Sequence, residues 1–297
     1  MNIKIRHIKT EDDLRLQGVE YEPEKKDICV LLVHGMSGNF IENYFASVLG
    51  EELAKEQIGF IYGHNRGYSH VNDINTSELI EKGGYKSRRI GAMYEIFTDC
   101  LLDIEGWMKK CRELGYKRII LAGHSLGVPK VIHYLNDRNT DNLVGILLLS
   151  PCDMVGVFKK YHLNFEDLYK EARENVANRE PRKLLNTQIW DWYTLSSQTF
   201  LSLFEEKSPV DNLPVHRPDD PFEKLAKIDL PILCIMGEYD DVGINNLEED
   251  MNLISLKATN CPAFTKKFIP KASHVYDVQE LQLATEIRGW INNLKLI

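Results

Sequence analysis

The feature that most constrains the fold is a glycine-bounded turn between an apolar run and a helical pattern. The apolar run at residues 118–122 leads directly into Gly123-His124-Ser125-Leu126-Gly127. Apolar residues then recur at the spacing of one helix face over residues 128–135. A strand that turns at once into a helix needs glycine where the two backbones approach closely. We therefore predict a strand–turn–helix unit that carries Ser125 at its turn.

Similar apolar runs alternate with helical patterns along much of the chain. This alternation is typical of a parallel sheet covered by helices, and a continuous apolar run suits a central strand buried on both faces. The pattern predicts an α/β fold with a closing helix from residue 277. The expected strands are residues 3–8, 14–21, 28–33, 58–62, 118–122, 144–149, 231–236 and 268–269, and the expected helices include 40–57 and 93–114.

The segment at residues 151–225 interrupts this alternation, because it has helical patterns at residues 165–178 and 190–204 but no convincing strand. We expect it to form a helical cap over one end of the sheet. A polar stretch with a Gly-Gly pair, residues 71–86, predicts a long loop. The expected division is a main domain of residues 1–150 and 226–297, and a cap of residues 151–225.

The composition disfavours several kinds of partner and location. Lys plus Arg is 36 and Asp plus Glu is 44, and an acidic chain without a block of like charge is not expected to bind nucleic acid. No apolar run approaches the roughly 20 residues of a membrane helix, and the N-terminus lacks a secretory pattern. Six scattered cysteines without a CxxC pair indicate reduced thiols, as in a cytoplasmic protein. Nothing in the sequence predicts the oligomeric state.

Ser125 is the candidate nucleophile, because the strained turn is expected to lift its hydroxyl away from the sheet edge. A serine hydroxyl near neutral pH needs a base. Of the nine histidines, His274 follows the last predicted strand and precedes the closing helix. It is therefore expected at the same end of the sheet as Ser125. His34 and His124 also lie near strand ends, but each sits within a glycine turn whose backbone role explains its presence.

The base in turn needs an acid that holds its tautomer and stabilises its positive form. Asp240 and Asp241 follow the predicted strand at residues 231–236, which places both in a loop at the required end of the sheet. We predict Asp240 as the acid, with Asp241 and Asp153 as alternatives. The resulting chain order is nucleophile, acid, base.

Two backbone N–H groups are expected to face a negatively charged oxygen that forms beside Ser125. The N–H of Leu126 lies at a helix start, where it points outward. The loop after the first central strand supplies Met36 as the second donor, since Gly35 allows a close backbone approach. Arg66, after the next strand, is expected to tie neighbouring loops together.

Together these motifs resemble the α/β-hydrolase superfamily. Five motifs occur in the family order, namely the strand–His-Gly loop, Asn-Arg-Gly-Tyr-Ser at residues 65–69, the Gly-His-Ser-Leu-Gly elbow, Gly-x-x-Asp at residues 237–240, and the late His274. The resemblance covers residues 14–150 and 226–297, and its motifs are specific to the superfamily rather than to one substrate. The loop after Asn65 and the helical insertion also resemble a siderophore-esterase-like branch.

The resemblance implies a carboxylesterase that acts on a small-molecule acyl substrate through an acyl-enzyme, with Ser125 attacking and His274 as base. Thioesters, lactones and small amides are also open as substrates. The alternatives on the same fold are a non-hydrolytic ligand-binding protein and a cofactor-free lyase or acyltransferase. Asn65 and Tyr68 replace an aspartate and a glycine of the usual Arg-Gly segment, which concerns the shape of the loop and not the chemistry.

Neither a metal nor an organic cofactor is expected, because the sequence has no HExxH motif, no Cys/His ligand cluster and no dinucleotide fingerprint. Aromatic residues of the insertion, together with one histidine of the first loop, are candidates for the lining of a substrate pocket. They are His34, Trp190, Trp192, Tyr193 and Phe200.

Overall fold

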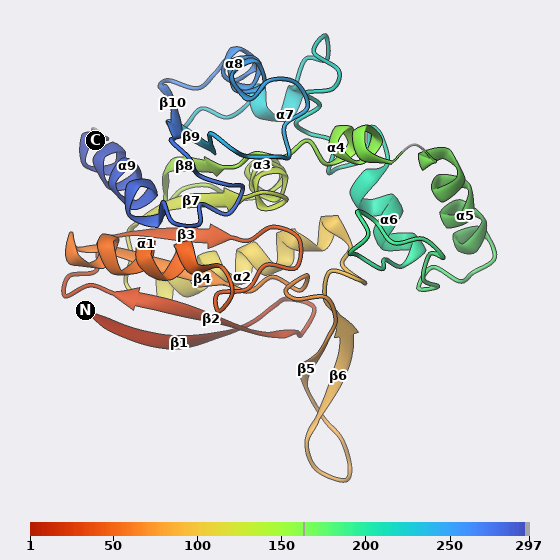
Figure 1. Cartoon of the computed structure of the whole chain (residues 1–297). Coiled ribbons are helices and arrows are strands. Elements are labelled where there is room, and N and C mark those ends of the chain that lie inside the picture. The colour runs from red at the N-terminus through yellow and green to blue at the C-terminus, as the bar shows by residue number, and fades with distance from the viewer. Residues whose placement is uncertain (163, 295–297) are drawn as a thin grey trace.

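The computed structural model describes residues 1–162 and 164–294, in which eight strands form one sheet in the order β1-β2-β4-β3-β7-β8-β9-β10 (Figure 1). β1 and β2 pair antiparallel with their neighbours, and all pairs from β4 to β10 are parallel. The strands of the sheet are β1 (Asn2–Lys9), β2 (Arg15–Glu22), β3 (Ile28–Val33), β4 (Ile58–Gly63), β7 (Arg118–His124), β8 (Leu143–Leu149), β9 (Ile232–Gly237) and β10 (Phe264–Ile269).

Helices cover both faces of this sheet, which explains the continuous apolar runs. Every residue of β3 is buried, and its side chains alternate between two cores. Leu31 packs with residues of α2, α3 and α8, whereas Leu32 packs with residues of α1 and α9. These helices are α1 (Tyr44–Lys55), α2 (Cys100–Glu113), α3 (Gly127–Asp137), α8 (Leu247–Lys257) and α9 (Glu280–Asn293).

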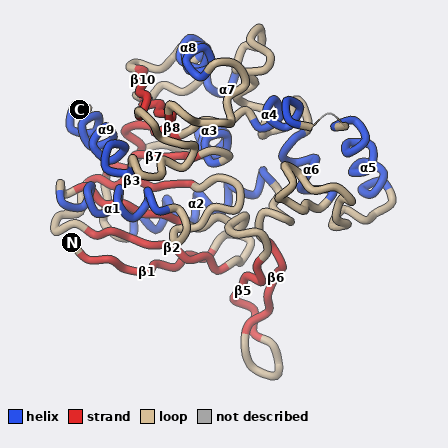
Figure 2. The backbone as a smooth tube through the Cα atoms, viewed as in Figure 1, coloured by secondary structure: helices blue, strands red, loops and turns tan. Residues whose placement is uncertain are grey.

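The segment between β8 and β9 contains four helices and long loops among its described residues, and the first three of these helices lie to one side of the sheet (Figures 1 and 2). Its helices α4, α5 and α6 share a third apolar core, in which Phe158, Tyr169 and Phe200 pack on one another. Residues nearer its end, such as Phe222, pack with the core of the sheet instead. The proposed boundaries of a separate cap stay a prediction. The helices are α4 (Met154–Tyr161), α5 (Phe165–Ala177), α6 (Ser197–Phe204) and α7 (Glu223–Ala226).

The predicted loop at residues 71–86 is wrong, because a β-hairpin of β5 (Asn72–Leu79) and β6 (Tyr85–Ile90) projects from the body of the protein there (Figure 2). Most of its side chains are exposed, so the strands lack the apolar alternation that identifies a half-buried strand. Gly83 and Gly84 form its tip with φ of +83° and +97°.

Two predicted helices begin seven residues later than expected, at Cys100 and at Ser197. The pattern at residues 93–114 resolves into a short 3₁₀ turn, Phe97–Asp99, followed by α2. The pattern at residues 190–204 becomes helical at Ser197, after the Ser196 side chain accepts a hydrogen bond from the Thr199 N–H as an N-cap. Trp190 has a φ of +53°, which is incompatible with a right-handed helix.

Five of the six cysteines are buried, and Cys261 is partly exposed. None of the helices in the described part of the chain is long and apolar enough to cross a membrane.

Candidate active site

Ser125 sits between β7 and α3 with a φ of +55°, in the left-handed region that side chains rarely adopt. The flanking glycines allow this turn. A Cβ on Gly127 would lie 2.1 Å from the Val33 carbonyl oxygen, and a Cβ on Gly123 would lie 2.5 Å from the Gly127 carbonyl oxygen. The Ser125 N–H donates to the Leu149 carbonyl at 3.0 Å, which anchors the turn to the neighbouring strand.

His274 and Asp240 are joined by a hydrogen bond of 2.9 Å between His274 Nδ1 and Asp240 Oδ1. The Asp240 side chain is fully buried. Burial raises the pKa of its carboxyl, but the hydrogen bonds from His274 and the Val242 N–H outweigh this effect, and the net pKa lies below its ordinary value. Asp240 is therefore a carboxylate at neutral pH, placed to hold Nδ1 of the imidazole protonated.

Two side chains donate hydrogen bonds to the backbone of the loop that carries His274. His124 Nε2 donates to the His274 carbonyl oxygen at 2.9 Å, and the Ser150 hydroxyl donates to the same oxygen at 3.1 Å. Burial lowers the pKa of His124 to about 4, so its ring is neutral at pH 7. His124 thus acts on the site through the backbone of His274.

The two alternative acids have other surroundings. Asp241 is exposed and lies at the edge of the cavity. Asp153 caps α4 by accepting from the Gly156 N–H at 2.8 Å, and its other oxygen bonds His216 Nδ1 at 2.7 Å. Within the described residues, Asp240 is thus the carboxylate that bonds His274.

The loop after β3 passes close over Ser125, where a Cβ on Gly35 would lie 2.8 Å from the Ser125 Cβ. Its shape is held by His34, whose Nδ1 donates to the Gly35 carbonyl at 2.7 Å while Nε2 accepts from the Asn65 N–H at 2.8 Å. The N–H groups of Met36 and Leu126 make no hydrogen bond with any described residue. Both amides are therefore free to bind an oxygen of a ligand.

Arg66 is 2% exposed and holds the surrounding loops together, as its position predicts. Its guanidinium donates to Asp103 on α2, to Asp12 after β1, and to Asp99 before α2. This ion network, in which Arg66 and Asp103 are buried, fixes the start of the segment that leads from β4 into the hairpin.

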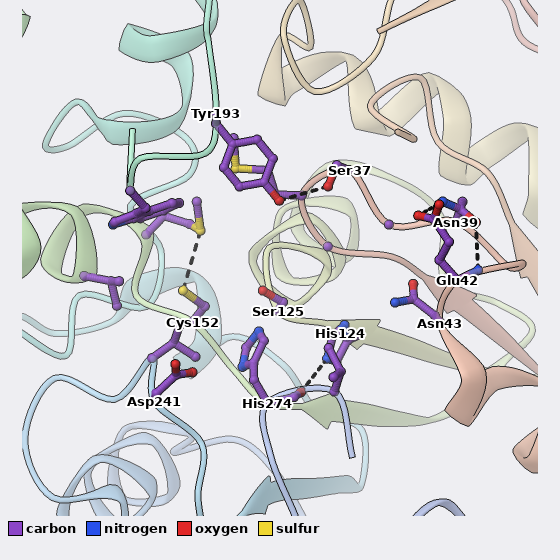
Figure 3. A pocket seen from close by; sticks show the side chains of 18 of the residues that line it. Ser37, Asn39, Glu42, Asn43, His124, Ser125, Cys152, Tyr193, Asp241 and His274 are labelled. Atoms are coloured by element: carbon purple, nitrogen blue, oxygen red, sulfur yellow. Dashed lines mark hydrogen bonds between the residues drawn. The ribbon is translucent and has the colours of Figure 1, made fainter. Parts of the chain in front are cut away.

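A cavity of about 540 Å³ opens above Ser125 and His274 (Figure 3). Two of the predicted pocket residues, Trp190 and Tyr193, line it. Three others do not line it. His34 is fully buried beneath the loop that it shapes, Phe200 lies in the core of the insertion, and Trp192 is 64% exposed to solvent.

Sequence reasoning missed several residues that line the cavity. The signal for the polar ones was their position directly after the glycine loop of β3, at the carboxyl end of a parallel strand. The apolar ones follow β8 and β9, at the same edge of the sheet. The missed residues include Asn39, Glu42, Asn43, Met154, Val157, Tyr161 and Val242.

One group of metal-ligand side chains occurs among the described residues: Asp153, Asp211 and His216, whose ligand atoms lie within 4.8 Å of one another. Arg217 already occupies this group, donating to Asp211 at 2.7 Å and lying 2.6 Å from His216 Nε2. A guanidinium in this place supplies the positive charge that a metal ion would otherwise provide.

Comparisons with known proteins concern the elbow segment and the fold. Residues 103–183, which contain the elbow, match the family described as Serine hydrolase. Est1E from Butyrivibrio proteoclasticus, solved with ferulic acid bound, superposes with a TM-score of 0.65 at 15% identity, over 97% of this chain and 98% of that one. The Pyrococcus furiosus esterase Pf2001 superposes with a TM-score of 0.62 at 16% identity, over 99% and 91% of the two chains.

A third structure, of DcsB in complex with a substrate analogue, gives a TM-score of 0.69 at 14% identity over the full length of both chains. No curated protein matches the sequence. The sheet, its helices and these superpositions define a protein of the α/β-hydrolase fold, and the predicted fold class is confirmed. The Serine hydrolase match covers residues 103–183, less than half of the chain, and the superpositions show the fold. The siderophore-esterase-like branch stays a prediction.

Proposed function

We propose that this protein is a serine hydrolase that cleaves a carboxylic ester of a small molecule, with Ser125 as nucleophile, His274 as base and Asp240 as acid. The observation that carries the proposal is the 2.9 Å hydrogen bond between the buried Asp240 and His274, at a cavity that the strained Ser125 also lines. A nucleophile, a base and a group that orients the base is the arrangement that activates a serine hydroxyl.

The reaction follows from these positions. Ser125 Oγ attacks the ester carbonyl while His274 Nε2 accepts the hydroxyl proton, and Asp240 stabilises the imidazolium. The free N–H groups of Met36 and Leu126 stabilise the oxyanion of the tetrahedral intermediate. The C–O bond to the alcohol then breaks, and His274 donates the proton to the leaving oxygen. A water molecule, deprotonated by the same histidine, hydrolyses the acyl-enzyme and releases the acid.

The mechanism requires a hydrogen bond between Ser125 and His274. Among the described residues, the Ser125 hydroxyl forms no hydrogen bond with the His274 ring. Catalytic hydrogen bonds of this kind often tighten only when substrate binds.

The cavity supports a small-molecule substrate, because its volume of about 540 Å³ lies within the range of roughly 300–1,000 Å³ common for small-ligand sites. Thioesters, lactones and small amides react by the same sequence of steps. An ester is the proposed substrate because the esterase neighbours share the fold.

The experiment is covalent labelling with a fluorophosphonate followed by peptide mass analysis. We expect modification of Ser125 in the native protein and none in Ser125→Ala. Ser255→Ala, which alters a serine on α8 that does not line the cavity, is the matched control and should label normally. A folded native protein that stays unlabelled would contradict the proposal and favour a ligand-binding role.

A further inference from the structure

The cavity extends to both sides of Ser125, and the two sides differ in chemistry. In Figure 3, Cys152 and Asp241 lie on one side of Ser125, whereas Asn39, Glu42 and Asn43 lie on the other. We call these sides the apolar arm and the polar arm. Cys152 belongs to an apolar cluster with four other residues of the cavity lining, namely Met154, Val157, Trp190 and Val242, and these five residues define the apolar arm.

The polar arm is built by the loop after β3. Asn39 is buried, and its Nδ2 donates to Glu42 Oε2 at 2.7 Å, while its Oδ1 accepts from the Glu42 N–H at 2.9 Å. These bonds hold the Glu42 carboxylate at the cavity. Its second oxygen, Oε1, makes no hydrogen bond with a described residue.

Asn43 adds a donor to this arm. Its Oδ1 accepts from the Tyr62 hydroxyl at 2.5 Å, so the amide oxygen is satisfied by the protein. The Nδ2 group makes no hydrogen bond within the described part of the chain. The polar arm therefore offers both an acceptor, on Glu42, and a donor, on Asn43, to a group bound there.

The charges along the cavity have one sign. Its lining includes the carboxylates of Glu42 and Asp241 but no lysine or arginine. Neither carboxylate forms an ion pair with a described residue, and His124 is neutral because burial lowers its pKa to about 4. A cationic group in the cavity is attracted to these carboxylates, whereas an anionic group is repelled.

We propose that the polar arm is a substrate subsite in which Glu42 selects for an ammonium group, so that the preferred substrate is an ester joining an apolar group to an amino- or ammonium-bearing group. The inference rests on the proposed function, since Ser125 must cleave the ester bond between the two groups. Glu42 acts here as a specificity-determining residue.

The test compares three butyrate esters that differ in the charge of the alcohol: choline, its uncharged isostere 3,3-dimethylbutanol, and the anionic isethionate. We expect kcat/KM for the choline ester to exceed that for the neutral ester by about fivefold, because Glu42 is exposed and an exposed ion pair contributes at most about this factor. The anionic ester should be the slowest. A second series carries the same charges on the acyl side, since either half of the ester can occupy the polar arm.

Glu42→Gln keeps the size of the side chain and removes its charge, so the ratio of cationic to neutral kcat/KM should fall toward one. Glu51→Gln, which changes an exposed acid on α1 outside the cavity, is the matched control and should preserve the ratio. Added salt should also reduce the ratio in the native protein.

Each outcome separates the two proposals. Ser125-dependent hydrolysis without a cation preference in either series would overturn the subsite and leave the proposed function standing. If no ester in the panel is hydrolysed, two organophosphorus probes test the subsite instead. One probe has a choline-like leaving group and the other a dimethylbutyl leaving group, and the rates at which they label Ser125 are compared. Equal rates overturn the subsite. Absence of labelling by both probes overturns the proposed function as well.

Discussion

The hydroxyl of Tyr193, in the insertion, lies 2.9 Å from the hydroxyl of Ser37, in the loop after β3. Ser37 is the neighbour of Met36, whose N–H faces the cavity in the proposed mechanism. Tyr193 is thus connected to the loop that would bind the oxyanion.

Tyr193→Phe keeps the ring and removes this bond. We expect kcat/KM for a neutral ester to fall about fivefold, because one neutral hydrogen bond contributes about 1 kcal/mol. Tyr85→Phe, on the exposed hairpin, is the control and should retain full activity. An unchanged kcat/KM in Tyr193→Phe would show that the loop needs no support from the insertion.

Substitution of the three proposed catalytic residues should abolish turnover without unfolding the protein. Asp240→Asn should lower kcat by a factor on the order of 10⁴, because the amide no longer holds the required imidazole tautomer. Asp241→Asn, one residue further, should retain most activity. Loss of activity in Asp241→Asn with retention in Asp240→Asn would move the acid by one position.

Glycine at the elbow is expected to contribute strongly to stability. Gly127→Ala places a Cβ 2.1 Å from the Val33 carbonyl oxygen, a backbone atom that cannot swing away, and should lower the free energy of unfolding by about 2–3 kcal/mol. Gly289→Ala, on the exposed side of α9 with open space around it, should raise this free energy by about 0.5–1 kcal/mol. Urea denaturation of both variants checks the opposite signs.

Lys130 on α3 and Glu95 before α2 form a fully buried ion pair. We therefore expect the effects of substituting these two residues on stability to be strongly coupled. Lys130→Met leaves the Glu95 carboxylate buried without its partner and should cost about 3–5 kcal/mol of stability. The double variant Lys130→Met/Glu95→Leu should recover much of this loss. Additive effects of the two single changes in a double-mutant cycle would disprove the coupling.

Stability should fall as the pH is lowered from 6.5 toward 4. Burial lowers the pKa of His64 and of His124 to about 4, and that of His34 well below its ordinary value. In this window the unfolded chain binds protons at these rings and the folded protein does not, so each ring costs about 1.4 kcal/mol per pH unit. Urea denaturation from pH 7 to pH 4.5 measures the slope, which His64→Gln should reduce.

The fold was largely predictable because buried parallel strands such as β3 and β9 are continuous apolar runs, and the glycines around Ser125 mark the turn between β7 and α3. The hairpin was not predictable, since β5 and β6 pair with each other in solvent and bury few side chains. Cross-strand pairing, the burial of Ile74 and Ile90 and the hydrogen bonds from Ser77 to Asp13 hold them, and these contacts leave no periodic apolar pattern.

The candidate site could be predicted from residues that follow strands, but the pattern does not choose between two adjacent residues of the same type. The pattern places Asp240 and Asp241 in one loop but cannot say which of them turns inward. In the structure, the Asp240 N–H bonds the Gly237 carbonyl at 3.2 Å, and the turn directs this side chain toward His274. The polar arm depends on how Asn39 folds its own loop, and spacing along the chain carries no such information.

The projecting hairpin has a practical consequence. A Cβ on Gly83 or Gly84 would meet no atom within 4 Å, and neither residue lines the cavity. Exposed tips of this kind tolerate insertions and are preferred sites of proteolytic nicking. A fluorescent reporter spliced between Gly83 and Gly84 should therefore leave hydrolysis intact, which makes this tip the natural attachment point for immobilising the protein with its cavity accessible.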